Sequence, residues 1–186
     1  MNDKFEIATL ANGCFWCSEA IFKRLKGVKS VLPGYSGGLV KNPSYDQVCT
    51  GKTGHAESIQ IQFDPKVIPF ERILDVFWHT HDPTTLNRQG NDVGTQYRSA
   101  IFYHNEKQKE IAEKSKKNLE KEGLYKDSIV TKITPFNNFY EAEDYHKNYY
   151  DKNQDAPYCN FIIDPKVRKL VLRYGNDVNE EYQRKK

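Results

Sequence analysis

Residues 5–25 read FEIATLANGCFWCSEAIFKRL and contain the transition that decides the fold. Residues 5–11 predict a strand, and the Asn12-Gly13 pair ends it. Beyond that pair, four residues recur at the spacing of one helical face: Cys14, Ser18, Ile21 and Leu25. This spacing predicts a helix that Gly27 ends. A strand followed so directly by a helix indicates a fold in which the two alternate.

Short strands and helices continue to alternate downstream. Further strands are predicted at residues 28–35, 58–63, 97–103 and 129–134. Further helices are predicted at residues 69–78, 105–123, 142–150 and 164–174. Pro33 limits the second strand to a sheet edge or an early end, because proline has no N–H to donate. Two irregular stretches, 34–54 and 79–95, interrupt the pattern, and such long loops in a compact domain often carry function.

This order of elements predicts an α+β fold. We expect a two-layer sandwich in which helices pack on one mixed sheet, with a split-βαβ (ferredoxin-like) core and long loops. Residues 1–175 are expected to form a single domain, followed by a polar, frayed tail at 176–186. A doubly wound nucleotide fold is disfavoured, because the junction at residues 12–15 is too short to wrap a pyrophosphate.

Composition excludes several classes of protein. The chain has 186 residues, of which 38% are hydrophobic and 28% charged, enough for one core without disulfides or metal. It has neither a run of about 20 apolar residues nor a visible leader, so we expect no membrane association and a cytoplasmic location. The 28 basic and 25 acidic residues are interspersed, which argues against nucleic acid as a partner. In a reducing compartment, the four cysteines are expected to be catalytic, redox-active or inert.

Cys14 is the strongest candidate for a functional residue. It follows a predicted strand and stands in the first turn of a predicted helix. Free backbone N–H groups and the positive end of the helix dipole favour a thiolate at such a position. The simpler alternative is a buried cysteine that packs as a small apolar residue.

Cys14 and Cys17 also form a C-x-x-C pair, the spacing of a redox disulfide at a helix start. Phe15 and Trp16 between them would form an apolar wall beside the sulfur, or would simply pack in the core. Zinc would need two further ligands, and no remaining pair of Cys and His residues has the spacing of a structural site. We therefore expect neither a metal nor a cofactor.

Glu57 stands at the start of a predicted strand, directly after the glycine-containing stretch 51–56. A carboxyl group there can act as a general acid if an apolar setting raises its pKa. The alternative is an exposed glutamate at a strand end. Tyr45, Asp92 and Tyr97 lie in or beside the two irregular stretches, where site residues tend to gather.

Five blocks, taken together, resemble the signature of the peptide methionine sulfoxide reductase A family. They are GCFW at 13–16, GYSGG at 34–38, YDQVCTGKTGHAE at 45–57, GNDVGTQYRS at 90–99 and AEDYH at 142–146. The resemblance covers about residues 5–165. It implies a catalytic domain that reduces methionine-S-sulfoxide, free and in proteins, and so repairs oxidative damage.

The same resemblance assigns roles to the candidate residues. Cys14 would attack the sulfoxide sulfur and become a sulfenic acid. Glu57 would protonate the oxygen, which is a poor leaving group until it is protonated. Phe15 and Trp16 would form the apolar pocket for the S-methyl group of the substrate. Tyr45 and Tyr97 would donate hydrogen bonds to its oxygen, and Asp92 would act near that oxygen through water.

Regeneration of the thiol requires a resolving cysteine. Tyr158-Cys159 resembles the family's resolving segment, but the glycine-rich tail with a further cysteine is absent. Cys17 stands where many members have glycine. Cys159, Cys17, or Cys159 with Cys17 as a relay could therefore resolve the sulfenic acid, and we favour Cys159. The resemblance implies thioredoxin as the reductant, a monomer is expected, and Cys49 is interpreted as structural.

Two other functions fit part of this sequence. A thioredoxin-like dithiol oxidoreductase built on Cys14 and Cys17 would reduce disulfides and form no methionine. A binding module would recognise oxidised or aromatic peptides through a surface rich in the 12 tyrosines. Both leave Glu57, the glycine-containing loop and the block at residues 92–97 unexplained.

Overall fold

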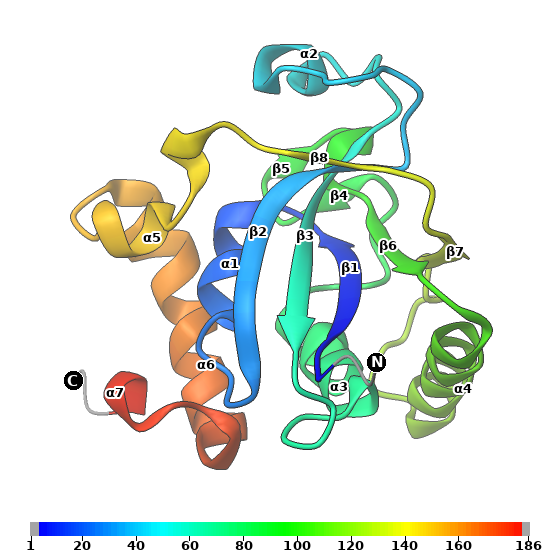
Figure 1. Ribbon diagram of the computed structural model, residues 1–186, viewed down its shortest axis with the longest axis vertical. Coiled ribbons are helices and arrows are strands. Elements are labelled where there is room, and N and C mark those ends of the chain that lie inside the picture. The colour runs from blue at the N-terminus through cyan, green and yellow to red at the C-terminus, as the bar shows by residue number, and fades with distance from the viewer. Residues whose placement is uncertain (1–3, 184–186) are drawn as a thin grey trace.

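A computed structural model describes residues 4–183 and shows an α+β fold built on a mixed six-stranded sheet (Figure 1). The strands are β1 (Glu6–Asn12), β2 (Val28–Ser36), β3 (Ala56–Phe63), β6 (Ser99–Tyr103), β7 (Lys132–Pro135) and β8 (Phe139–Glu141). Their order in the sheet is β7-β6-β1-β3-β2-β8. All neighbours run antiparallel except β6 and β7, which are parallel. Strands β4 (Arg88–Gln89) and β5 (Asp92–Val93) form a separate hairpin.

Seven α-helices lie within the described part of the chain. They are α1 (Phe15–Phe22), α2 (Tyr45–Cys49), α3 (Phe70–Thr80), α4 (Glu106–Glu122), α5 (Tyr149–Lys152), α6 (Asp164–Tyr174) and α7 (Glu180–Gln183). Within residues 4–183, none of the helices has the length and apolar character needed to cross a membrane.

The main core lies between one face of the sheet and the helices. Leu10 of β1 pairs with Ile59 of β3 and with Ile101 of β6, so their side chains share one face, and all three are fully buried. Helical side chains complete this cluster: Ile21 and Phe22, Ile73 and Phe77, and Leu170. The next pair along, Thr9 and Gln60, faces the opposite side of the sheet. This alternation fixes the register of β1 and so the place where it ends.

The junction between β1 and α1 follows the sequence-based prediction closely. Gly13 adopts a left-handed conformation at φ +94°, which favours glycine, and an added Cβ would lie 2.7 Å from Gln89. The Ser18 hydroxyl donates to the Asn12 side chain, which ties the end of the strand to the helix. The helix ends at Phe22, before Gly27, and Leu25 forms a β-bridge with Val178.

Most other predicted elements are present. The helix at 105–123 appears as α4, with Asn105 accepting from the Gln108 N–H and Gly123 ending it at φ +64°. Pro33 lies inside β2, next to residues that pair with β8. The expected edge position or early end is wrong, because β2 lies between β3 and β8 and continues to Ser36, and the strand tolerates Pro33 just beyond the residues that pair with β8.

Two expectations about elements are wrong. Residues 142–150 do not form one helix, because Asn148 adopts φ +55° between a 3₁₀ turn (Asp144–His146) and α5. The Asn148 N–H instead donates to the Glu19 carboxylate at 2.9 Å. The short helix α2, inside the stretch expected to be loop, starts at a capping box between Ser44 and Gln47.

The expected frayed tail is packed instead. Val178 is fully buried in the main core, and Asp177 pairs with Arg72. Backbone hydrogen bonds add to these contacts, because the Lys26 N–H donates to the Asp177 carbonyl at 2.7 Å and the Asn179 N–H donates to the Arg24 carbonyl at 2.9 Å. Residues 184–186 of that expected tail lie outside the described residues.

Candidate active site

Cys14 occupies the N-cap position of α1 and is 8% exposed. Burial raises its pKa well above the ordinary value, and the neighbouring Cys17 and Glu57 raise it further. Loss of water around the sulfur therefore opposes the thiolate that the helix N-terminus is expected to favour.

Glu57 is the second residue of β3, and its side chain is 1% exposed. Its Oε2 accepts the N–H of Phe15 at 3.0 Å, which places an acid beside the first residue of α1. Burial raises the Glu57 pKa to about 8, against the lowering effect of that N–H, and Asp92 and Cys17 add to the rise. The carboxyl group is therefore protonated at neutral pH, the state that a general acid requires.

Two phenols surround the acid. Tyr45 starts α2, and Tyr97 ends the 3₁₀ turn Thr95–Tyr97. Burial raises the pKa of each hydroxyl, and the charge of Glu57 raises it further. Both hydroxyls therefore keep their protons and can donate hydrogen bonds near Glu57.

Asp92 reaches the site from the β4–β5 hairpin and is held by Tyr158, whose hydroxyl donates to it at 2.9 Å. The same Tyr158 oxygen lies 4.0 Å from the Cys17 sulfur. The C-terminal segment thus closes over the start of α1. Tyr158 carried no predicted role, although it stands next to the predicted resolving cysteine.

Phe15 and Trp16 point in different directions. Phe15 is 1% exposed and packs on Tyr35 and His146, with ring centroids 5.8 and 4.9 Å away. Trp16 is only partly buried and stacks on Tyr149 at 3.7 Å with an interplanar angle of 5°. Tyr149 therefore covers one face of the partly buried Trp16 ring, whereas Phe15 lies in the core.

Comparison with known proteins decides the family. The profile of the peptide methionine sulfoxide reductases matches residues 6–178. The chain belongs to this family. The reductase is 59% identical over 169 residues to the peptide methionine sulfoxide reductase MsrA of Sulfolobus acidocaldarius, covering 91% of this chain and 95% of the relative. It is therefore an oxidoreductase that reduces peptide methionine sulfoxide.

Solved structures agree with this assignment. Reduced Mxr1 from Saccharomyces cerevisiae superposes with a TM-score of 0.80 at 37% identity, covering 86% of this chain and 91% of Mxr1. Mxr1 in complex with Trx2 gives a TM-score of 0.56 at 26% identity, covering 80% and 87%.

Three of the reductase's four cysteines lie together. Cys14, Cys17 and Cys159 share a small apolar cluster with Ala20 and Ile163, and all three are free thiols. A hydrogen bond from Cys14 lowers the Cys17 pKa, whereas burial raises that of Cys159. Cys49 is exposed at the end of α2 and does not belong to this cluster, and its interpretation as a structural thiol stays a prediction.

Sequence reasoning missed a network behind Trp16. The Trp16 Nε1–H donates to Nδ1 of fully buried His146 at 3.0 Å. Glu143 accepts the Tyr35 hydroxyl and the Tyr45 N–H, both at 2.8 Å. The AEDYH block was the available signal, because it contains Glu143 and His146, but no role was assigned to it. These residues orient the rings and helix that line the site.

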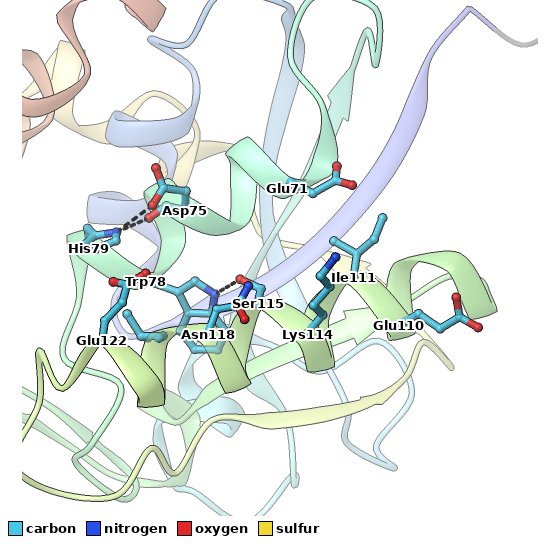
Figure 2. Close-up of a pocket in the computed structure, with 11 residues that line it drawn as sticks. Glu71, Asp75, Trp78, His79, Glu110, Ile111, Lys114, Ser115, Asn118 and Glu122 are labelled. Carbon is cyan, nitrogen blue, oxygen red and sulfur yellow. Dashed lines mark hydrogen bonds and ion pairs between the residues drawn. The ribbon is translucent and has the colours of Figure 1, made fainter.

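Hollows also lie elsewhere on the reductase. A groove of about 550 Å³ runs between α3 and α4 (Figure 2), where Trp78 donates to Ser115 at 2.6 Å. None of the candidate catalytic residues lines it. Among residues 4–183, no group of three or more His, Cys, Asp or Glu side chains could hold a metal ion.

Proposed function

We propose that this reductase converts methionine-S-sulfoxide, free and within proteins, to methionine at Cys14, and so repairs oxidative damage. One observation carries the proposal. A protonated Glu57 is fixed by the Phe15 N–H at the start of the helix whose N-cap is Cys14. The two sulfoxide epimers have separate reductases, and membership of this family supports the S epimer.

The residues support a two-electron transfer of oxygen. The Cys14 sulfur attacks the sulfoxide sulfur while Glu57 gives its proton to the oxygen, and the thiol proton replaces the one given. The S–O bond of the substrate breaks, methionine leaves, and Cys14 carries the oxygen as a sulfenic acid. Methionine sulfoxide is thereby reduced to methionine, and the Cys14 sulfur is oxidised by the same two electrons. A raised Glu57 pKa suits this step because the acid must be neutral before the reaction.

Substrate orientation follows from the surrounding side chains. The Tyr45 and Tyr97 hydroxyls would hold the oxygen, because both keep their protons near Glu57. Asp92 would act beside them through water. The Trp16 ring, together with Phe15, would receive the S-methyl group, since apolar and aromatic surfaces favour it.

Recycling completes the proposed function. Cys159 would take part in a disulfide that thioredoxin reduces, because it shares a cluster with Cys14 and Cys17. The complex of the yeast relative Mxr1 with Trx2 supports a thioredoxin partner. A split-βαβ core is part of the same proposal, supported by the antiparallel order β6-β1-β3-β2.

Assays with separated epimers test the function. With thioredoxin, thioredoxin reductase and NADPH, the enzyme should form methionine from the S epimer and little from the R epimer. Cys14→Ser should abolish methionine formation, whereas the exposed Cys49→Ser control should retain it. Methionine formation by Cys14→Ser would refute the assignment. Reduction of insulin disulfides without methionine formation would favour the dithiol oxidoreductase instead.

A further inference from the structure

A buried carboxylate behind Trp16 takes no part in the proposed chemistry. Glu19 follows Trp16 by three residues on α1, a spacing that places both side chains on the same side of the helix. The Glu19 side chain is only 3% exposed, although charged side chains are rarely buried without a partner. Both of its oxygens lie 2.9 Å from the backbone nitrogen of Asn148, whose N–H donates to them. Glu19 therefore anchors a segment that is 129 positions away in the sequence.

Asn148 is the residue at which this segment changes direction. Its φ of +55° lies in the left-handed region, which asparagine adopts more readily than most residues other than glycine. The Lys23 ammonium, four residues after Glu19, donates to the Asn148 side-chain oxygen at 2.6 Å and to Asp151 at 2.5 Å. The helix α1 thus holds Asn148 both by its N–H and by its side chain. Such contacts maintain a backbone conformation that costs free energy in isolation.

The turn at Asn148 places the residues on either side of it at two different parts of the Trp16 ring. Before the turn, Nδ1 of His146 accepts the indole N–H at 3.0 Å. After the turn, Tyr149 stacks on the indole, with centroids 3.7 Å apart and an interplanar angle of 5°. In a continuous helix, residues 146 and 149 would lie one above the other on a single face. The left-handed residue therefore lets one segment hold both the edge and a face of Trp16.

We propose that Glu19 is a positioning residue for substrate selection. By holding Asn148 it keeps Tyr149 against Trp16, and the supported indole then limits the group on the sulfoxide sulfur to methyl. The proposal rests on the proposed function, because that function places the S-methyl group at Trp16. It deepens the function by naming the substrate class, methyl sulfoxides in preference to longer alkyl sulfoxides, and the contacts that select it.

Rigidity of the ring matters because methyl and ethyl groups differ by one methylene. A wall that cannot move excludes the extra carbon by steric overlap, whereas a ring that is free to tilt makes room for it. One methylene in a hydrophobic pocket changes kcat/KM by about 10- to 200-fold. None of the contacts that hold Trp16 involves the Cys14 sulfur or the Glu57 carboxyl group. Loss of these contacts should therefore relax selection while the chemical step continues.

The selectivity of the full-length enzyme tests the proposal. The measured quantity is the ratio of kcat/KM for L-methionine-S-sulfoxide to that for L-ethionine-S-sulfoxide, which should be about tenfold or more in the wild type. Glu19→Ala should lower this ratio several-fold, mainly through faster reduction of the ethyl substrate. Glu19→Gln should restore most of the ratio, because its amide oxygen can still accept the Asn148 N–H.

Two results of this assay would overturn the proposal. One is an unchanged ratio in Glu19→Ala, and the other is a wild type that does not distinguish the two substrates. Absence of methionine formation by the wild type would instead refute the proposed function on which the proposal rests.

Variants of Tyr149 test the route by which Glu19 acts. Tyr149→Leu removes the stacked ring and should lower the ratio as Glu19→Ala does, whereas Tyr149→Phe keeps the ring and should keep the ratio. Adding Glu19→Ala to Tyr149→Leu should lower the ratio no further, because Glu19 acts through that ring. Additive effects would contradict this route. If Glu19→Ala does not fold, Tyr149→Leu still decides, since an unchanged ratio in that variant would also overturn the proposal.

A destabilised variant elsewhere separates selection from stability. Leu119 is buried in the main core on α4, so Leu119→Ala lowers stability without touching the contacts of Trp16. The ratio should stay at the wild-type value, because any loss of folded enzyme affects both substrates equally. A fall as large as that in Glu19→Ala would show that general loosening relaxes selection, and would overturn the role of Glu19.

The indole N–H signals report on the ring directly. The chain has two tryptophans: Trp16 donates to His146 at 3.0 Å, and Trp78 donates to Ser115 at 2.6 Å. In NMR spectra of enzyme that contains ¹⁵N-labelled tryptophan, the Trp16 signal should shift or broaden in Glu19→Ala. The Trp78 signal should stay in place and serves as the internal control. A Trp16 signal that does not change would overturn the proposal, because Glu19 would then not hold the ring.

Discussion

At the scale of single residues, Glu57 shows how burial produces a general acid. Its side chain is enclosed between β3 and the start of α1, and one backbone N–H is its hydrogen-bond donor. A single N–H does not compensate an ionised carboxylate for the water that it loses. Asp92 and Cys17 add negative charge nearby, so the neutral form is favoured further.

The raised pKa of Glu57 has a measurable effect on stability. Below pH 4.5 the group is protonated in the folded and unfolded chains alike. Between pH 4.5 and about 8 the unfolded chain ionises while the folded chain keeps its proton, so the free energy of unfolding falls as pH rises. Glu57→Gln removes this loss and can still accept the Phe15 N–H. The free energy of unfolding of Glu57→Gln minus that of the wild type should be higher above pH 8 than at pH 4, by on the order of 3–5 kcal/mol.

Urea unfolding of the wild type and Glu57→Gln from pH 4 to pH 9 measures this difference. Titrations of all other groups contribute to both proteins, so they cancel in the comparison. The gap between the two stabilities should widen through the stated window and level off above it. A gap that stays constant with pH would show that Glu57 ionises normally in the folded protein.

At the scale of elements, the junction between β1 and α1 positions the nucleophile. Gly13 turns the chain with a positive φ, and the side chain of Gln89 from the β4–β5 hairpin lies against it. The same hairpin carries Asp92. One glycine therefore sets both the direction of α1 and the approach of the hairpin to Cys14.

Substitution of two glycines separates strain from crowding. Gly13 and Gly123 both have positive φ, but an added Cβ would lie 2.7 Å from Gln89 at Gly13 and would meet nothing within 4 Å at Gly123. Gly123→Ala should therefore cost about 1 kcal/mol of stability and leave methionine formation unchanged. Gly13→Ala should cost more and reduce the first-turnover rate at least tenfold. Thermal unfolding and single-turnover assays check both, and equal behaviour would exclude crowding at the junction.

Local signals explain which elements could be predicted from the sequence. The Asn105 cap and Gly123 end of α4, and the alternation of Ile59 and Ile61 in β3, depend on neighbouring residues alone, and both predictions are confirmed. The predicted helix at 142–150 failed because a tertiary contact between Asn148 and Glu19 overrides the local pattern. The roles of the candidate site residues remain predictions, although the structure gathers them around Cys14.

At the scale of the whole molecule, the C-terminal part of the chain encloses α1. Figure 1 shows α5, α6 and α7 running down the side of the molecule where α1 lies. Buried Arg24 donates to Asp151 at 2.7 Å and lies over the rings of Tyr150 and Tyr182. These contacts join residues more than a hundred positions apart, so no local pattern could predict them. They hold the segment bearing Tyr158 and Cys159 against the helix that bears Cys14 and Cys17.

Val178 distinguishes a packed C-terminus from the frayed tail expected from its polar sequence. It is fully buried and pairs with Leu25, directly after α1. Val178→Ala removes two buried methyl groups and should lower the free energy of unfolding by about 1–3 kcal/mol. The exposed nearby residue provides the control, since Glu180→Ala should change stability by less than about 0.5 kcal/mol. A frayed segment would make the two variants indistinguishable in urea unfolding. A packed segment would make Val178→Ala clearly less stable than Glu180→Ala, and would show that the fold supporting Cys14 includes the segment around Val178.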